Sequence, residues 1–140
     1  MLAGVAIDHP VGLLGHSDAD VVAHAVTDAL LGAAGLGDIG ALFPDDDPVY
    51  EGASSVALLR DVVARVRDAG WRVANVDVTV VCEGPKLGPH RDRMRGNLAA
   101  ALGVGADAVG LKATTTEGMG FEGRGEGIAA SAVCLLERGA

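Results

Sequence analysis

Apolar residues recur every three to four positions in three stretches of the chain, and this spacing predicts three amphipathic helices. The helices are expected over residues 18–33, 54–69 and 90–102. Ser17 or Asp18 is a candidate N-cap for the first helix, and Gly35 or Gly37 suits its end.

Alternation of apolar and polar residues predicts strands elsewhere, most clearly where Val76, Val78 and Val80 are separated by polar residues. Strands are expected over residues 2–7, 71–82, 108–113 and 128–136. The order strand, helix, helix, strand, helix, strand, strand predicts a single α/β (α+β) domain over 1–140. We expect a mixed, ferredoxin-like β-sheet with helices on one face.

The amino-acid composition limits which partners the protein can have and in which cellular compartment it works. The chain has 140 residues, of which 49% are hydrophobic and 3% aromatic, so Val, Leu and Ala must build most of a single core. The net charge of −8 argues against a nucleic-acid partner. Two cysteines are too few for a disulfide framework and favour a reduced, cytoplasmic setting. The N-terminus lacks a basic region and is too short to span a bilayer, so we expect neither secretion nor membrane attachment.

A candidate metal and anion site begins at His16. Asp20, His24 and Asp28 are spaced four apart and share one helix face. Neutral imidazole is a common zinc ligand, and a nearby carboxylate can orient the ring. His16 precedes the helix, where backbone N–H groups attract anions. The alternatives are a solvated polar stripe and a surface or capping histidine.

Hydroxyl groups gather beside a carboxylate at Thr114, Thr115, Thr116 and Glu117. Such hydroxyls, with backbone N–H groups, can hold phosphate oxygens while Glu117 binds magnesium, which prefers oxygen ligands. The run is not a Walker loop, because the Gly-Lys-Ser/Thr ending is absent. A plain strand end is the alternative, since threonine favours strands.

Three further loops are candidates for ligand contacts. The rigid loop at 84–89 offers backbone groups that could read the edge of a base, or is a simple turn. Residues 38–40 and 45–47 could bind hydroxyls or form acidic loops in water. Arg124, between two glycines, suits diphosphate recognition or a subunit contact, although the glycine-rich run could also be a hinge.

Taken in order, these segments resemble the 2-C-methyl-D-erythritol 2,4-cyclodiphosphate synthase family of the non-mevalonate isoprenoid pathway. The matching segments are HSDADVVAHAVTDALLGAAGLGDIGALFPDDDP, NVDVTV, PK, PH and KATTTEGMGFEGRGEGIAA. They cover nearly the whole chain from Gly12 onward, and KATTTE followed by GF and GRGEGIA is highly specific.

The resemblance implies a phosphorus–oxygen lyase reaction. The 2-phosphate of 4-diphosphocytidyl-2-C-methyl-D-erythritol 2-phosphate attacks the β-phosphate, CMP departs, and a cyclic diphosphate forms. The family uses Zn²⁺ and Mg²⁺, which neutralise crowded phosphates and template an in-line attack. It forms homotrimers with active sites between subunits and a central cavity.

The resemblance also implies roles for individual residues. His16 and Thr115 match catalytic positions, His24 matches a zinc ligand, and Glu117 matches the magnesium contact. The substrate-binding positions are Ser17, Asp38, Ile39, Gly40, Phe43, Pro44, Asp45, Asp46, Asp47, Cys82, Glu83, Gly84, Pro85, Lys86, Leu87, Gly88, Thr114, Thr116, Glu117, Phe121 and Arg124.

The N-terminus departs from the family pattern. The family begins with a strand carrying an Asp-x-His pair of zinc ligands, whereas Asp8-His9 has the wrong spacing and lies in an expected loop. We therefore expect a chain shortened at its N-terminus. The alternatives to an active cyclase are an impaired fragment, a nucleotide or isoprenoid-diphosphate binding module without a complete zinc site, and a piece of a bifunctional protein. Gly118 stands where many relatives carry lysine.

Overall fold

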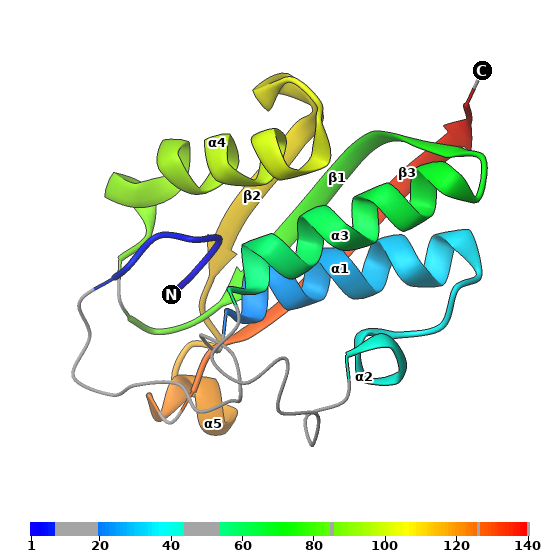
Figure 1. Cartoon of the computed structure of the whole chain (residues 1–140). Helices are drawn as coiled ribbons and strands as arrows, with labels where there is room; N and C mark the ends of the chain where they lie inside the picture. The colour runs from blue at the N-terminus through cyan, green and yellow to red at the C-terminus, as the bar shows by residue number, and fades with distance from the viewer. Residues whose placement is uncertain (8–19, 44–53, 85, 126, 140) are drawn as a thin grey trace.

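The computed structural model describes residues 1–7, 20–43, 54–84, 86–125 and 127–139. In these residues a three-stranded mixed sheet carries helices on one face (Figure 1). The strands are β1 (Trp71–Val81), β2 (Val109–Thr114) and β3 (Ala129–Arg138). Their order is β2-β1-β3, with β2 parallel and β3 antiparallel to β1. This confirms the expected mixed sheet with helices.

The central strand, β1, follows its sequence pattern. Val76, Val78 and Val80 are buried, while Asn75 and Asp77 are exposed. The apolar side chains therefore point toward the helices, as alternation requires.

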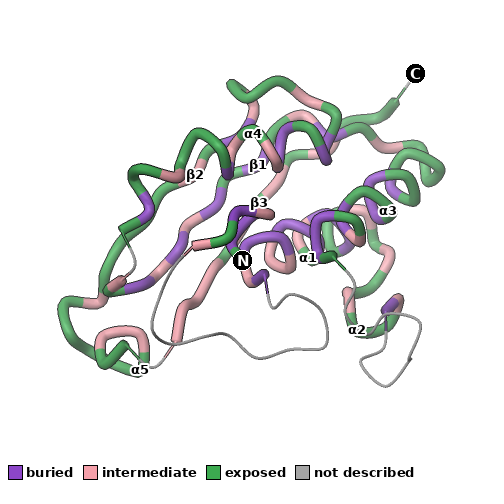
Figure 2. Tube along the Cα trace, turned by 60° about the vertical axis from the view of Figure 1, so that its left-hand side comes forward, coloured by how far each residue is buried: buried purple, intermediate pink, exposed green. Residues whose placement is uncertain are grey.

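Three long helices form the second layer. They are α1 (Val21–Ala34), α3 (Ser55–Asp68) and α4 (Arg91–Leu102). Helix α1 packs on β3 and β1, α4 packs on β2, and α3 lies between the other two helices (Figure 1). Buried leucine, valine and alanine side chains fill the space between helices and sheet. Figure 2 colours the buried residues along the helices and the central strand. The low aromatic content is thus matched by a core of aliphatic side chains.

The helix ends agree only in part with the sequence pattern. Gly35 closes α1 in the left-handed conformation with φ of 71°, as predicted. The N-cap, however, is Asp20 rather than Ser17 or Asp18. The short helices in the described ranges were not predicted, because a single turn has too few positions to show a period. They are α2 (Ile39–Leu42), η2 (Gly88–His90), η3 (Ala106–Ala108) and α5 (Gly120–Gly123).

The predicted strand over residues 2–7 is wrong. Leu2 and Val5 form one isolated bridge around a tight turn, with backbone bonds of 2.9 Å in both directions. Ala3 and Gly4 occupy the turn with φ of 48° and 75°. A methyl group on Gly4 would lie 3.1 Å from Cγ2 of Val56, so the turn packs closely on α3.

The sheet face opposite the helices carries both charged and apolar side chains. Lys112 Nζ lies 2.6 Å from Oδ2 of Asp77 on the neighbouring strand. On β3, Val133 and Leu135 are 69% and 61% exposed. Such large exposed aliphatic side chains on neighbouring strand positions are typical of a contact surface. No helix in the described ranges is long and apolar enough to cross a membrane.

Candidate active site

Four element ends meet at one end of the sheet. The parallel strands β1 and β2 finish there, and α1 and α3 begin there (Figure 1). The carboxyl ends of parallel strands are the usual ligand-binding edge of such sheets, and helix N-termini favour anions. This edge therefore suits a phosphate-bearing ligand.

His24, the predicted zinc ligand, lies in the first turns of α1. Its Nε2 is 2.8 Å from the hydroxyl of Ser55, the first residue of α3. Ser55 is fully buried, so its hydroxyl is held firmly against the ring. The bond orients the imidazole, as a partner on one ring nitrogen typically does for a ligating histidine. Ser55 was not identified from the sequence, because 31 residues separate it from His24.

The carboxylates predicted to share a face with His24 serve other purposes. Asp20 is fully buried and accepts bonds from the backbone N–H groups of Ala3, Gly4 and Ala23 at 2.8, 2.7 and 2.9 Å. Asp28 accepts from the Ile39 N–H at 2.8 Å. Both carboxylates thus hold the backbone, and the ring of His24 is oriented by a hydroxyl instead.

The threonine-rich segment leaves the sheet at the end of β2. Thr114 is the last residue of the strand, and Thr115, Thr116 and Glu117 follow in a loop. Glu117 adopts φ of 54°, which is uncommon for a side chain other than glycine. Its N–H donates to Thr115 Oγ1 at 3.2 Å, and the Thr116 hydroxyl donates to the Met119 carbonyl. The loop presents the exposed Glu117 carboxylate at the candidate edge.

The loop after β1 runs beside this segment. The Cys82 N–H donates to the Thr114 carbonyl at 3.0 Å and so extends the pairing of the strands. Beyond it, Glu83 Oε1 accepts from the Gly118 N–H at 3.0 Å and lies 3.5 Å from the Thr116 hydroxyl. The loop predicted to hold cytidine is therefore bonded directly to the loop predicted to hold the diphosphate.

The remainder of the 82–88 loop combines buried and exposed side chains. Cys82 and Leu87 are buried, whereas Lys86 and Gly88 are exposed and Gly84 is half-buried. Burial, followed by the nearby charge of Glu83, raises the pKa of the Cys82 thiol. The thiol therefore stays neutral at neutral pH.

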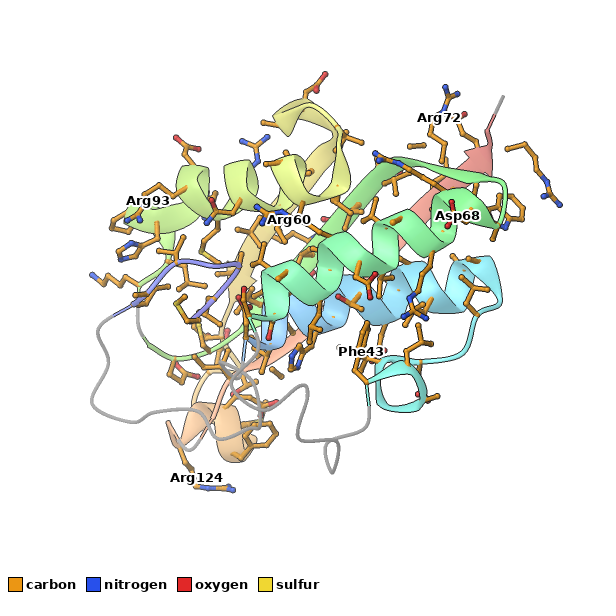
Figure 3. The ribbon with its side chains drawn as sticks, viewed as in Figure 1. Phe43, Arg60, Asp68, Arg72, Arg93 and Arg124 are labelled. Carbon is orange, nitrogen blue, oxygen red and sulfur yellow. The ribbon has the colours of Figure 1, made fainter. Side chains whose placement is uncertain are left out.

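The residues around α2 that are predicted to contact substrate make structural contacts in the described part of the chain, and their substrate role stays a prediction. Asp38 caps α2 by accepting from the Ala41 N–H at 2.9 Å. Phe43 is buried in the core, with the Arg65 guanidinium 5.6 Å from its ring centre (Figure 3). Ile39 is half-buried and Gly40 exposed.

Helix α5 backs onto the threonine-rich loop. A methyl group on Gly123 would lie 2.2 Å from the carbonyl carbon of Gly118, so only glycine fits there without movement. Phe121 is 45% exposed, and Arg124, also exposed, follows at the end of α5 (Figure 3). Phe121 lies in the short helix that packs on the loop carrying Glu117, and Arg124 is the C-cap of that helix.

The remaining predicted residues lie outside the described ranges. They are His16, Ser17, Pro44, Asp45, Asp46, Asp47 and Pro85. Among the residues that are described, no group of three or more His, Cys, Asp or Glu side chains is placed to hold a metal.

The fold is that of a small α/β protein with a candidate ligand site at the carboxyl ends of its parallel strands. The YgbB family model matches residues 1–137. A 2-C-methyl-D-erythritol 2,4-cyclodiphosphate synthase from Bordetella avium is 60% identical over 138 residues, which are 99% of this chain and 85% of that protein.

Solved structures agree with this match. A 2C-methyl-D-erythritol-2,4-cyclodiphosphate synthase in its CDP-bound form has a TM-score of 0.89 and 41% identity, covering 98% of this chain and 89% of that one. The bifunctional IspDF from Campylobacter jejuni has a TM-score of 0.94 and 45% identity, and the match covers 99% of this chain and 37% of that one. This chain belongs to the YgbB family. It is an enzyme of that family, since the relatives that match almost all of it are named as synthases.

Proposed function

We propose that this chain converts 4-diphosphocytidyl-2-C-methyl-D-erythritol 2-phosphate to 2-C-methyl-D-erythritol 2,4-cyclodiphosphate and CMP. The relative from Bordetella avium bears the name of this synthase, and a similar structure binds CDP. The observation that carries the proposal is the bond between the two loops, in which Glu83 accepts from the Gly118 N–H at 3.0 Å. This bond joins the loop that we assign to cytidine to the loop that we assign to the diphosphate.

The reaction forms one phosphorus–oxygen bond and breaks another. An oxygen of the 2-phosphate attacks the β-phosphorus, and the bond from that phosphorus to the oxygen bridging to CMP breaks. CMP leaves with the electron pair, and no water is consumed. Catalysis of this kind depends on positioning and on charge stabilisation.

Each segment has a part in this positioning. Residues 82–88 hold the cytidine, with Lys86 directed to the phosphates. Thr114, Thr115 and Thr116 contact the diphosphate, with Thr115 beside the reacting phosphorus. Arg124 and Phe121 extend the contact from α5. His16 and Ser17, which lie outside the described residues, keep the phosphate-positioning role that the resemblance implies. Residues 44–47, also outside the described residues, are assigned to the substrate hydroxyls.

Magnesium fits the donors on the threonine-rich loop. Mg²⁺ takes oxygen ligands and is commonly bound by one or two carboxylates together with substrate phosphates. Glu117 is an exposed carboxylate in a loop that we assign to the diphosphate, so it is the proposed protein ligand. The ion would neutralise the negative charge that accumulates when two phosphates approach each other.

For zinc, His24 supplies a single suitable donor. Its ring is oriented by Ser55, as is usual for a ligating histidine. A zinc site needs three or four protein ligands. The part of the chain with described structure does not assemble them. We therefore propose His24 as one zinc ligand and assign no other.

We also propose a cytoplasmic homotrimer of ferredoxin-like subunits, with active sites between them. Val133 and Leu135 are exposed on the sheet face away from the helices, and copies of this face would cover one another around a threefold axis. Light scattering should give three chains per particle. Val133→Glu should lower that mass, whereas Ala64→Glu on exposed α3 should not. A monomeric wild type would contradict the trimer.

The first test of the activity is CMP release by the purified chain with Zn²⁺ and Mg²⁺ present. We expect CMP to appear with the cyclic diphosphate, and Thr115→Ala to reduce turnover more than CDP affinity. Binding of CDP without CMP release would favour the nucleotide-binding module. If the chain neither binds CDP nor releases CMP, both the synthase and the nucleotide-binding module are overturned.

A further inference from the structure

The side chain of Glu83 crosses from the loop after β1 to the loop after β2. Its Oε1 accepts from the Gly118 N–H at 3.0 Å, across 35 residues of sequence. The same oxygen lies 3.5 Å from the hydroxyl of Thr116. The Thr116 hydroxyl donates to the Met119 carbonyl, so the bond that holds the loop is the one to the Gly118 N–H, directly after the proposed magnesium ligand Glu117.

The backbone between these two contacts is strained. Glu117 has φ of 54° and Gly118 has φ of 84°. A side chain other than glycine in the left-handed region costs about 1–2 kcal/mol, and it persists only where its surroundings fix it. The Glu83 bond to the Gly118 N–H fixes the peptide that follows Glu117. Without it, the loop can relax and move the Glu117 carboxylate.

The far side of the loop is also constrained. A methyl group on Gly123 would lie 2.2 Å from the Gly118 carbonyl carbon, so α5 closes the space behind the loop. The loop is thus held between α5 on one side and Glu83 on the other. Glu83 is the contact that joins it to the loop assigned to cytidine.

We infer that Glu83 is a positioning residue, which sets the orientation of Glu117 and couples nucleotide binding to magnesium binding. This departs from the role of direct substrate contact implied for Glu83 by the resemblance. The carboxylate acts through the Gly118 N–H, and only one acceptor oxygen is needed for that bond. The inference rests on the proposed function for its link to turnover, while the link between the loops is independent of it.

The variants Glu83→Ala and Glu83→Gln separate these roles. Alanine removes the acceptor, whereas glutamine keeps Oε1 and removes the charge. Asp68→Ala, on the exposed far end of α3, is a matched control for loss of one carboxylate (Figure 3). Three quantities should be measured: CDP affinity with and without Mg²⁺, hydrogen exchange of the Gly118 amide, and the Mg²⁺ dependence of CMP release.

Glu83→Ala should weaken the enhancement of CDP binding by Mg²⁺ and lower kcat by about tenfold, which is typical when the support of a metal ligand is removed. CDP affinity without Mg²⁺ should stay within about twofold of wild type, and the Gly118 amide should exchange faster. Glu83→Gln should return each of these quantities most of the way to its wild-type value. Asp68→Ala should behave as wild type.

Three results would overturn the inference. The first is an unchanged Mg²⁺ dependence in Glu83→Ala. The second is a Gln variant as impaired as the Ala variant, because the carboxylate charge would then act directly on the ligand. The third is unchanged exchange at Gly118. A wild-type chain that releases no CMP would instead overturn the proposed function, and CDP binding with the exchange measurement would still decide the role of Glu83.

Discussion

The hydroxyl of Ser55 lies 2.8 Å from Nε2 of His24 and joins the first turns of α3 and α1. Ser55 is completely buried, so the two helices present His24 in one fixed orientation. A metal-ligating histidine depends on such a partner, because the bond at one ring nitrogen sets the direction of the other. The role of His24 can therefore be tested through Ser55.

Ser55→Ala should lower the Zn²⁺ affinity of the protein by roughly tenfold, since loss of a ring-orienting partner typically costs ten- to a hundredfold. Competition with a chromophoric zinc chelator measures the change. Ser54→Ala is the matched control, because Ser54 caps α3 by accepting from the Ala57 N–H at 3.3 Å. The control should cost about 1 kcal/mol of stability and leave zinc affinity unchanged. If Ser55→Ala and Ser54→Ala have the same Zn²⁺ affinity, Ser55 does not orient a zinc ligand.

Replacement of Asp20 should destabilise the fold strongly. Its carboxylate satisfies three backbone N–H groups, and Asp20→Ala would leave them without that acceptor. We expect a loss of about 3 kcal/mol in the free energy of unfolding by urea. Asp20→Asn should also destabilise, because its amide NH₂ cannot accept from the N–H groups on that side.

Asp28→Ala is the control for Asp20, because the exposed Asp28 accepts a single bond, from Ile39. It should cost about 1 kcal/mol. A loss for Asp20→Ala no larger than this would show that the buried carboxylate does not anchor the N-terminal turn.

Ala3→Gly should raise stability. Ala3 has φ of 48°, a conformation that glycine adopts without steric strain. Relief of the strain, about 1–2 kcal/mol, is partly offset by the added chain entropy of the unfolded state and by loss of the buried Ala3 methyl contacts, so the net gain should be about 0.5 kcal/mol or less. Thermal unfolding measures the gain, and Ala6→Gly, at an exposed position without positive φ, should lower stability instead. A lower thermal unfolding midpoint for Ala3→Gly than for wild type would contradict a strained positive φ at Ala3.

The two cysteines should resist alkylation at mildly alkaline pH. Burial raises the pKa of both thiols, and the charge of Glu83 adds to the effect at Cys82. Iodoacetamide labelling at pH 8 should therefore be slow in the folded protein and faster in urea, because only the thiolate reacts. CDP should protect Cys82 and leave Cys134 unaffected. Labelling of Cys82 that CDP does not slow would argue against a cytidine pocket at residues 82–88.

The same pKa shifts give stability a pH dependence. A thiol with a raised pKa keeps its proton in the folded state after the unfolded chain has released it. The folded state then binds more protons, so the free energy of unfolding falls as pH rises above the usual thiol pKa of 9.0. At lower pH the two thiols should not change the free energy of unfolding as pH varies. Replacement of both cysteines by alanine should flatten the alkaline decline in urea unfolding curves.

Long periodic elements were predictable from local sequence. The predicted range 71–82 compares with β1 at Trp71–Val81, and 54–69 compares with α3 at Ser55–Asp68. Burial of one face requires a regular spacing of apolar residues, so the period survives in the sequence. The segment at 2–7 failed because a few apolar residues resemble a strand, whereas the buried carboxylate of Asp20 holds them in a turn.

The sequence by itself determined the long helices and strands, the aliphatic character of the core and the two motifs that identify the family, because each depends on residues close together in the chain. Only the tertiary structure decided which side chains meet. Asp20 reaches Ala3 across 17 residues, His24 reaches Ser55 across 31, and Glu83 reaches Gly118 across 35. None of these pairs has a spacing that secondary structure imposes, since each depends on how α1, α3 and the strand ends pack. The spacing of residues thus predicted the kind of chemistry, and the packing of helices on the sheet decided which partner orients each group.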